Sequence, residues 1–308
     1  MRKEDAAVDK RGGDRRRELD PAEKARLAEL KSDAHDTQVD VETHLAAIRE
    51  QLAETADDRE AVPESAKAVI RLEEVSLSFG ARQILKNVSL EARMGETLMV
   101  AGESGSGKST ILKLILRLLV PDNGRIFVFD DEVELLSFQE ALEMRREIGM
   151  VFQNAALFDS LTVYENVAYP LRENTELDEA EIERTVAEKL DFVDLDPKVV
   201  MRQLPSQLSG GMRKRVGIAR AIATNPKIIL YDEPTAGLDP LTVGTINDLV
   251  RKLQRELRVT SLVVTHDIRA GFRVASRVNL LREGEIVFDG TPEEMVASDD
   301  NYIKAFLS

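Results

Sequence analysis

Apolar and polar side chains alternate along the part of the chain that follows Ala66. Apolar residues occupy positions 70 and 72, then 75, 77 and 79, and again 88, 90 and 92, and Gly80 and the polar segment around residues 82–86 separate the runs. A period of two is typical of half-buried strands. The pattern therefore predicts antiparallel strands over this segment.

A short apolar run over residues 97–101 leads into a glycine-rich stretch and then into a helical pattern. The helical pattern places apolar residues at 111, 112, 114, 115, 118 and 119, and Pro121 ends it. Because proline cannot continue a helix, we expect the helix to run through Leu119. The predicted order is a strand, a tight loop and a helix.

The rest of the chain alternates helical and strand-like patterns. Residues 155–205 are mostly helical in pattern. Two β-rich runs, residues 227–231 and 261–265, lie between helical stretches, as expected of buried parallel strands. A hairpin follows over residues 278–288, and the sequence Thr-Pro-Glu-Glu at 291–294 begins a last helix. The whole predicts an α/β fold with an antiparallel β edge and a helical insert over about residues 155–205.

The first 66 residues differ from the rest in composition. They carry dense mixed charge and almost no aromatic or β-branched residues, which leaves too little apolar surface for a core. We expect residues 1–66 to be a largely disordered extension and residues 67–308 to form the folded domain. One stretch of the extension has apolar residues at helical spacing, and a candidate N-cap, Asp40, precedes them. The apolar stripe consists of Val41, Leu45, Ile48 and Leu52. This short helix can stay solvated and frayed, or it can dock on the folded domain, on a second copy or on another subunit.

The overall composition excludes several classes of function. The chain has 308 residues with 42 Lys and Arg against 56 Asp and Glu, so its net charge is −14 and it offers no general basic face for nucleic acid. It has no cysteine, which excludes disulfides, thiolate catalysis and cysteine-bound zinc. No run reaches the roughly 18 apolar residues of a membrane-spanning helix, and the charged N-terminus is unlike a targeting sequence. We expect a cytoplasmic protein that does not bind nucleic acid.

The segment Gly102–Ser109 fits the pattern G-x-x-x-x-G-K-[ST] and lies between a predicted strand and a predicted helix. That context distinguishes a phosphate-binding P-loop from a chance match. The glycines let backbone N–H groups surround phosphates, and the start of the helix adds its dipole. Lys108 would neutralise the β- and γ-phosphates, and the Ser109 hydroxyl would coordinate Mg²⁺. The segment therefore predicts ATP and Mg²⁺ as ligands.

Two adjacent acids end the apolar run at residues 228–231. Asp232 is suited to hold Mg²⁺, and Glu233 is suited to act as the general base that activates water. An apolar run before two acids is common by itself, but beside a P-loop it indicates hydrolysis of ATP.

The stretch Leu208–Met212 reads Leu-Ser-Gly-Gly-Met and is similar to the LSGGQ signature of the ABC ATPases. At the start of a helix, Ser209, Gly210 and Gly211 offer a hydroxyl, bare backbone amides and a dipole end, which suit an anion. The resemblance implies the fold of this family, a RecA-like P-loop core with an antiparallel β subdomain and a helical subdomain. It also implies that two copies pair head to tail, the signature of each capping the γ-phosphate of ATP held by the other.

The same resemblance assigns roles to further residues. It implies that Gln153 senses Mg²⁺ and the attacking water, that His266 contacts the γ-phosphate, and that Asp239 belongs to the D-loop. Phe79 stands where an aromatic ring stacks on adenine. The implied nucleotide contacts along the loop are Gly102, Glu103, Ser104, Gly105, Ser106, Gly107, Lys108, Ser109 and Thr110. The implied metal ligands are Ser109, Gln153 and Asp232, and the implied catalytic residues are Glu233, His266 and Gln153.

Two positions depart from the family pattern, Glu103 in the P-loop and Met212 in place of the last glutamine of the signature. Glu103 replaces the more usual proline of the P-loop and brings an acid near the phosphates. Because like charges repel, we expect its carboxylate to point outward.

The segment 152–172 and Met212 resemble the ATPases of the Mla and Mce phospholipid-transport systems. That subfamily implies a peripheral subunit on the inner face of the cell membrane, bound to a permease that works with a lipid-binding protein beyond the membrane. The groove for the permease would lie around residues 155–171. Two alternatives stay open: an importer motor for a polar solute such as an amino acid, and a non-transport ABC ATPase acting on DNA or ribosomes. A third alternative is a nucleotide-binding scaffold without turnover. The last is disfavoured because Glu233 and His266 are both present.

Overall fold

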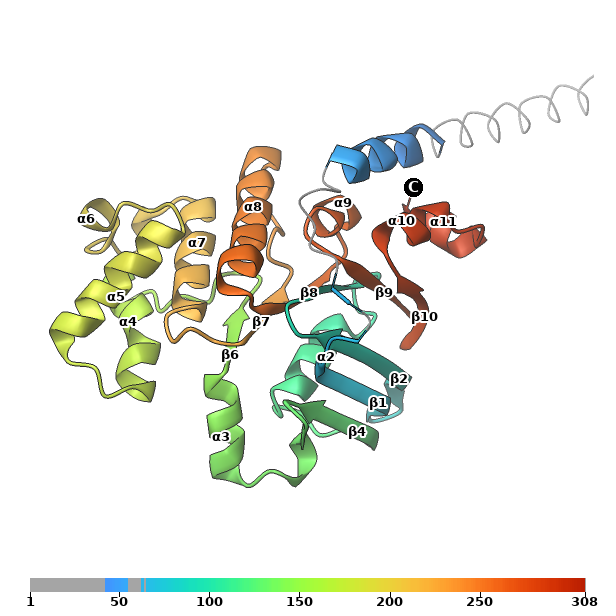
Figure 1. Ribbon diagram of the computed structural model, residues 1–308, viewed down its shortest axis with the longest axis horizontal. Helices are drawn as coiled ribbons and strands as arrows, with labels where there is room; N and C mark the ends of the chain where they lie inside the picture. The colour runs from blue at the N-terminus through green and yellow to red at the C-terminus, as the bar shows by residue number, and fades with distance from the viewer. Residues whose placement is uncertain (1–41, 55–61, 64, 308) are drawn as a thin grey trace, which may run out of the picture.

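The computed structural model describes residues 42–54, 62–63 and 65–307. The predictions for residues 1–41, including the cap at Asp40 and the apolar position at Val41, lie outside the described residues. The described chain forms two sheets that enclose helix α2 (Lys108–Ile115), with further helices on either side (Figure 1). No helix within these described ranges is long and apolar enough to cross a membrane.

A six-stranded, mostly parallel sheet forms the centre of the molecule. In spatial order its strands are β10 (Glu285–Gly290), β9 (Arg277–Arg282), β3 (Thr97–Ala101), β8 (Thr260–Thr265), β7 (Ile228–Asp232) and β6 (Ile148–Val151). Neighbours from β9 to β6 are parallel, and β10 returns antiparallel to β9. Every residue of β3 and β8 is buried, as expected of the predicted apolar runs at 97–101 and 261–265.

Parallel pairing brings four carboxyl ends to one edge of this sheet. β3 pairs with β8, β8 with β7, and β7 with β6, so Ala101, Thr265, Asp232 and Val151 lie at the same edge. The loops that follow these strands therefore lie together, at the position where open α/β sheets bind ligands.

The second sheet is antiparallel, as the alternation in the sequence predicts. Its order is β2 (Arg82–Arg93), β1 (Ala68–Phe79), β4 (Asn123–Val128) and β5 (Asp131–Glu132). The register of β1 against β2 shifts between Leu72 and Val75, which accounts for the change of phase in the apolar pattern there. The apolar faces of the two sheets bury α2 between them.

Helices flank the central sheet (Figure 1). In chain order they are α3 (Phe138–Arg146), α4 (Val163–Asn174), α5 (Glu179–Phe192), α6 (Pro197–Val200), α7 (Gly210–Ala221), α8 (Pro240–Leu257), α9 (Ile268–Phe272), α10 (Pro292–Ala297) and α11 (Asn301–Leu307), with short 3-10 turns at Val133–Leu135 and Pro205–Gln207. Complete capping boxes begin α3, α4, α5 and α10, so the local sequence determines where these helices start.

One predicted helix is too long. α2 ends at Ile115, and the expectation that it runs through Leu119 is wrong. Arg117 adopts a left-handed backbone with φ 52°, and Leu118 N donates to Lys113 O over 2.8 Å, which closes the helix before the proline is reached.

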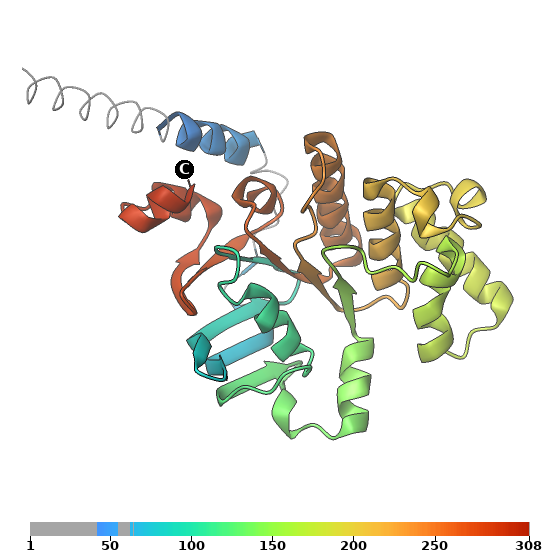
Figure 2. The ribbon, with the colours of Figure 1, turned by 180° about the vertical axis from the view of Figure 1, so that it is seen from behind.

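The helix over residues 42–54 packs on the body of the molecule (Figure 2). Leu45, Ile48 and Leu52 are buried in a cluster with residues of β3, β9, α9, α10 and α11. Gln51 Nε2 donates to Arg269 O over 2.8 Å, which ties this helix to α9. Of the alternatives that the sequence leaves open, docking on the chain's own folded domain is the one observed.

Candidate functional site

A cleft of about 360 Å³ lies at the edge where the parallel strands end, within the usual size range of ligand pockets. Its lining joins loops of the central sheet to the turn between β1 and β2. The lining residues are Phe79, Arg82, Ile84, Ser104, Gly105, Gly107, Lys108, Ser109, Thr110, Gln153, Glu233 and His266. All but Arg82 and Ile84 were singled out from the sequence.

The glycine-rich loop turns tightly between β3 and α2. Gly107 has φ 110°, and a Cβ there would lie 2.9 Å from Leu85 Cδ2, so only glycine fits. The buried Lys108 ammonium donates to Gly102 O over 2.8 Å and to Glu103 O over 2.9 Å. Burial lowers the pKa of Lys108, and the nearby carboxylates of Glu233 and Asp232 oppose that effect. The loop therefore holds the positively charged Lys108 ammonium at the N-terminal end of α2.

Ser109 and Asp232 meet at one side of this loop. The Ser109 hydroxyl donates to Asp232 Oδ1 over 2.7 Å, between the first turn of α2 and the last residue of β7. A hydroxyl and a carboxylate oxygen are hard ligands of the kind that Mg²⁺ prefers. The donor set therefore fits a magnesium ion that is also bound to phosphate.

Glu233 follows β7 and is held in a fixed position beside the loop. Its backbone is left-handed with φ 48°, which costs a residue other than glycine about 1–2 kcal/mol and is a feature found at functional sites. Thr265 Oγ1 donates to Oε2 over 3.1 Å, and His266 Nδ1 lies 3.0 Å from Oε1. Lys108 Nζ lies 3.8 Å from Oε1. The side chain is only 12% exposed, and these three groups hold its carboxylate in place.

Gln153 lies two residues beyond β6 at the margin of the cleft. Its backbone carbonyl accepts a hydrogen bond from Lys214 Nζ, which also donates to Glu233 O over 3.3 Å. Burial lowers the pKa of Lys214 to about 8. Lys214 could not be identified from the sequence, because helical spacing can indicate that a residue faces inward but cannot identify the two carbonyls that it meets.

The wall opposite these strand ends comes from the antiparallel sheet. Phe79 ends β1 and is 52% exposed, and Arg82 and Ile84 of β2 extend the same wall. Glu103 points outward from the P-loop, since Tyr302 Oη donates to its Oε1 over 3.4 Å. Its carboxylate thus lies away from the inside of the loop, as charge repulsion predicts. Ser106, which does not line the cleft, donates its backbone N–H to Glu103 O and closes the turn of the loop.

The signature residues lie outside this cleft. Ser209 caps α7 by accepting the backbone N–H three residues later over 3.2 Å, and Gly210 and Gly211 begin the helix. A Cβ on Gly211 would lie 2.6 Å from Thr242 Cγ2, so the signature turn fits closely against the start of α8.

Asp239 caps α8. Its carboxylate accepts hydrogen bonds from the Thr242 hydroxyl and from the N–H groups of Leu241 and Thr242. The Thr242 hydroxyl is the main cause of the lowered pKa of Asp239. The structure thus brings Asp239 to the surface that carries the signature and not to the cleft of the same chain.

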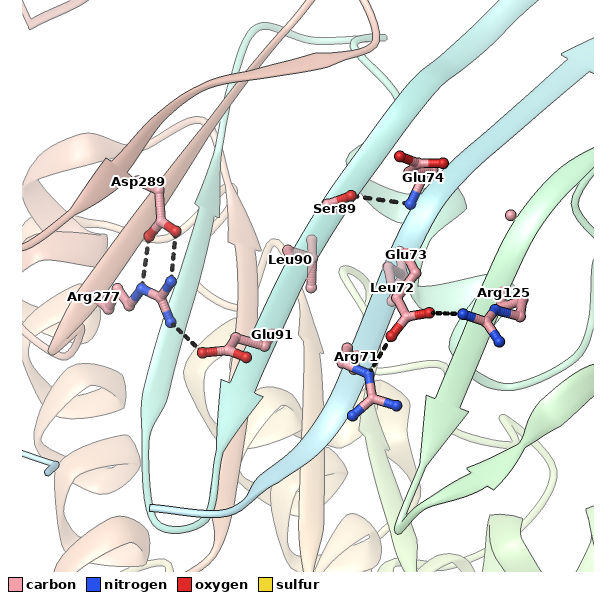
Figure 3. A pocket seen from close by; sticks show the side chains of 11 residues that line it. Arg71, Leu72, Glu73, Glu74, Ser89, Leu90, Glu91, Arg125, Arg277 and Asp289 are labelled. Carbon is pink, nitrogen blue, oxygen red and sulfur yellow. Dashed lines mark hydrogen bonds and ion pairs between the residues drawn. The ribbon is translucent and has the colours of Figure 1, made fainter. Parts of the chain in front are cut away.

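A larger pocket of about 660 Å³ is lined by charged side chains of β1, β2, β4, β9 and β10 (Figure 3). All of these charged side chains except Glu74 pair with one another. Arg277 Nε donates to Asp289 Oδ1 over 2.6 Å, Arg125 Nη2 donates to Glu73 Oε2 over 2.6 Å, and Arg71 also pairs with Glu73. Because these charges, apart from Glu74, are already paired within the pocket, we assign it no ligand.

Two curated proteins are similar to this chain over most of its length. It is 37% identical over 239 residues to the intermembrane phospholipid transport system ATP-binding protein MlaF of Haemophilus influenzae, covering 78% of this chain and 90% of that protein. It is 37% identical over 239 residues to the probable ribonucleotide transport ATP-binding protein mkl of Mycobacterium tuberculosis, covering 78% of this chain and 66% of that protein.

A family model and a solved structure agree with these relatives. The model described as ABC transporter matches residues 85–236. The MJ0796 cassette, solved as a dimer and as a dimeric post-hydrolysis state bound to ADP and Pi, is 37% and 36% identical in the two structures, each with a TM-score of 0.67 and covering 72% of this chain and 98% of that one. This chain therefore belongs to the ABC transporter family and is an ATP-binding, ATP-hydrolysing cassette of that family.

Proposed function

We propose that two copies of this chain pair head to tail around two ATP molecules and drive a membrane permease that moves phospholipid. The observation that carries the proposal is the separation of two half-sites in one chain. The cleft contains the P-loop and Glu233, whereas the signature turn at Ser209 lies outside it. A second copy can supply its signature to this cleft and receive this chain's signature in return. The related MJ0796 cassette is a dimer.

Hydrolysis in this proposal uses groups that already meet in the cleft. Glu233 takes the proton of a water that attacks the γ-phosphorus in line with the leaving ADP. His266 and Thr265, which lie 3.0 and 3.1 Å from its carboxylate oxygens, aim that carboxylate. Lys108 neutralises charge on the β- and γ-phosphates. Phe79 stacks on the adenine ring.

Mg²⁺ would be held by Ser109 and Asp232, with the Gln153 amide as a further ligand. When bound, the ion neutralises phosphate charge in the transition state. The remaining contacts to phosphate come from backbone N–H groups of the loop from Gly102 to Thr110. Ser209 and the two glycines of the second copy cap the γ-phosphate with their helix dipole.

The permease contact is proposed for a second cleft of about 410 Å³ beside the helical insert. Phe152, Phe158 and Tyr169 line it with 41%, 44% and 46% of their surface exposed, and Arg146 adds a positive charge. Clustered exposed aromatic rings mark protein interfaces. We expect a short helix of the permease to occupy this cleft, with an apolar face on the aromatic rings and an acidic residue that pairs with Arg146. Because Phe152 precedes Gln153 directly, movement of the docked helix would reach the nucleotide cleft.

Phospholipid is the proposed cargo because the MlaF relative is matched over 90% of its length. The lipid would contact the permease and a lipid-binding Mce- or Mla-type protein beyond the membrane, and not this chain. The chain would be a cytoplasmic protein, peripheral on the inner face of the cell membrane, and would not bind nucleic acid. The mkl relative, named for ribonucleotide transport, favours a second candidate, a motor for a polar solute.

Purification of the full chain with its membrane partner in mild detergent distinguishes the two candidates. We expect an Mla-type permease with co-purifying phospholipid, and a permease for polar solutes without bound lipid would contradict the first proposal. Tyr169→Asp should release the permease and retain ATP binding. Val199→Asp is the matched control, since it adds the same charge at a 59% exposed apolar residue on α6, outside the groove.

A further inference from the structure

Lys214 is a buried lysine that lies next to the cleft but is not part of its lining. It stands on α7, five residues after the signature Ser209, and the residue is 5% exposed. Its ammonium donates to the backbone carbonyls of Gln153 and Glu233, which follow two different strands of the central sheet. One cation therefore joins the signature helix, the loop after β6 and the loop after β7.

Overall stability does not explain a lysine at this position. Taking an ammonium out of water is costly, and an apolar residue of similar size at a buried charged site is often neutral or stabilising. The carboxylates of Asp232 and Glu233 attract the charge from β7 and the residue after it, but neither accepts a hydrogen bond from it. The contacts that its N–H groups do make are to the backbone.

The backbone of Glu233 needs support of this kind. It is left-handed, with φ 48°, and its N–H donates to Val264 O over 2.9 Å on β8. The hydrogen bond from Lys214 holds the other end of the same residue, its carbonyl. The direction of the Glu233 carboxylate depends on this backbone conformation. A strained backbone conformation persists only where the surrounding structure determines it.

We propose that Lys214 is a positioning residue for hydrolysis: it fixes the backbone of Glu233 and the loop of Gln153 relative to the signature helix. The proposal rests on the proposed role of Glu233 as the general base. It assigns Lys214 no contact with nucleotide. α7 thus has two tasks, since its first residues face the ATP of the second copy while Lys214 sets the catalytic glutamate of its own chain.

The test compares Lys214→Met with Lys189→Met in the full chain. Methionine keeps most of the side-chain volume and removes the donors. Lys189 is the matched control because it is another lysine with 5% exposure, on α5, whose ammonium donates to Asn225 Oδ1 over 2.8 Å. We expect Lys214→Met to lower kcat about 10- to 100-fold, as small misplacements of catalytic groups do, with unchanged ATP affinity and thermal stability. Lys189→Met should keep the parental kcat.

Three results would overturn the proposal: a parental kcat for Lys214→Met, a loss confined to ATP affinity, or an equal loss of kcat in both variants.

A second measurement separates positioning of Glu233 from an effect on pairing. In the Glu233→Gln background the carbonyl at 233 is retained, so ATP-dependent pairing should be the same with and without Lys214→Met. Loss of pairing only in the double variant would assign Lys214 to the signature and contradict the proposal. An unmodified chain without ATPase activity would overturn the proposed function itself.

Discussion

Ser109 donates its hydroxyl hydrogen to Asp232 Oδ1 over 2.7 Å, although 123 residues separate them along the chain. The bond joins the first turn of α2 to the last residue of β7, so the two halves of the candidate magnesium site are already aligned. Parallel pairing of β3 with β8 and of β8 with β7 is what brings them together.

Asp232→Asn tests the magnesium site. Asparagine keeps an acceptor for the Ser109 hydroxyl but removes the negative charge. Since a hydrogen-bonded charged group contributes about 1.5–3 kcal/mol, the Mg²⁺ concentration for half-maximal turnover should rise about 10-fold or more. Titration of ATPase activity with Mg²⁺ measures this midpoint concentration. An unchanged midpoint would mean that Asp232 does not hold the ion.

Lys108→Ala tests the phosphate cradle. Loss of the buried ammonium should weaken ATP binding roughly 10- to 100-fold, the range expected for a hydrogen bond to a charged group. Lys113→Ala is the control, because Lys113 is exposed on the same helix. Calorimetry with ATP measures both. Equal affinities for the two variants would contradict the assignment of the P-loop.

His266→Ala tests whether the imidazole aims the carboxylate of Glu233. With the partner at 3.0 Å removed, that carboxylate can turn, and we expect kcat to fall about 100-fold, comparable to the loss of one preorganised group in an active site. Nucleotide binding should change much less than turnover. Steady-state kinetics together with calorimetry separate the two, and a fall in affinity that fully explains the lost activity would speak against this role.

Ile48→Ala tests the docking of the helix over residues 42–54. Ile48 is 1% exposed in the cluster with α9, α10 and α11. Truncation of such a residue should lower the free energy of local opening by about 2–4 kcal/mol, which amide hydrogen exchange in this helix measures. Glu50→Ala, on the exposed face of the same helix, should leave exchange unchanged. Equal exchange in both variants would show that the helix is not held by its apolar stripe.

The motifs of the site could be predicted because their chemistry lies in a few consecutive residues. The loop from Gly102 to Ser109 needs only glycines, one cation and one hydroxyl before a helix. Asp232 and Glu233 follow an apolar run whose burial requires a parallel strand, and this places them at the edge of the sheet with the P-loop. Gln153 and His266 follow similar strands, but only the family resemblance indicated that they matter.

Contacts between distant segments could not be predicted from these patterns. Lys214 meets Gln153 across 61 residues, and Tyr302 meets Glu103 across 199 residues, and no local pattern names such partners. The stripe on the 42–54 helix shows that one face will be buried but not against which surface. The end of α2 could not be predicted, because the left-handed residue that follows the helix is Arg117 and not the glycine that commonly marks such a position.

ATP-dependent pairing of the Glu233→Gln chain is the most direct measurement of the central claim. Without its base the chain should bind ATP and lose at least about 100-fold of its turnover, so the closed pair accumulates. Light scattering should give twice the mass of one chain with ATP and Mg²⁺, and the mass of a single chain with ADP. If this variant stays single at saturating ATP, both in solution and on its permease, the head-to-tail account is contradicted.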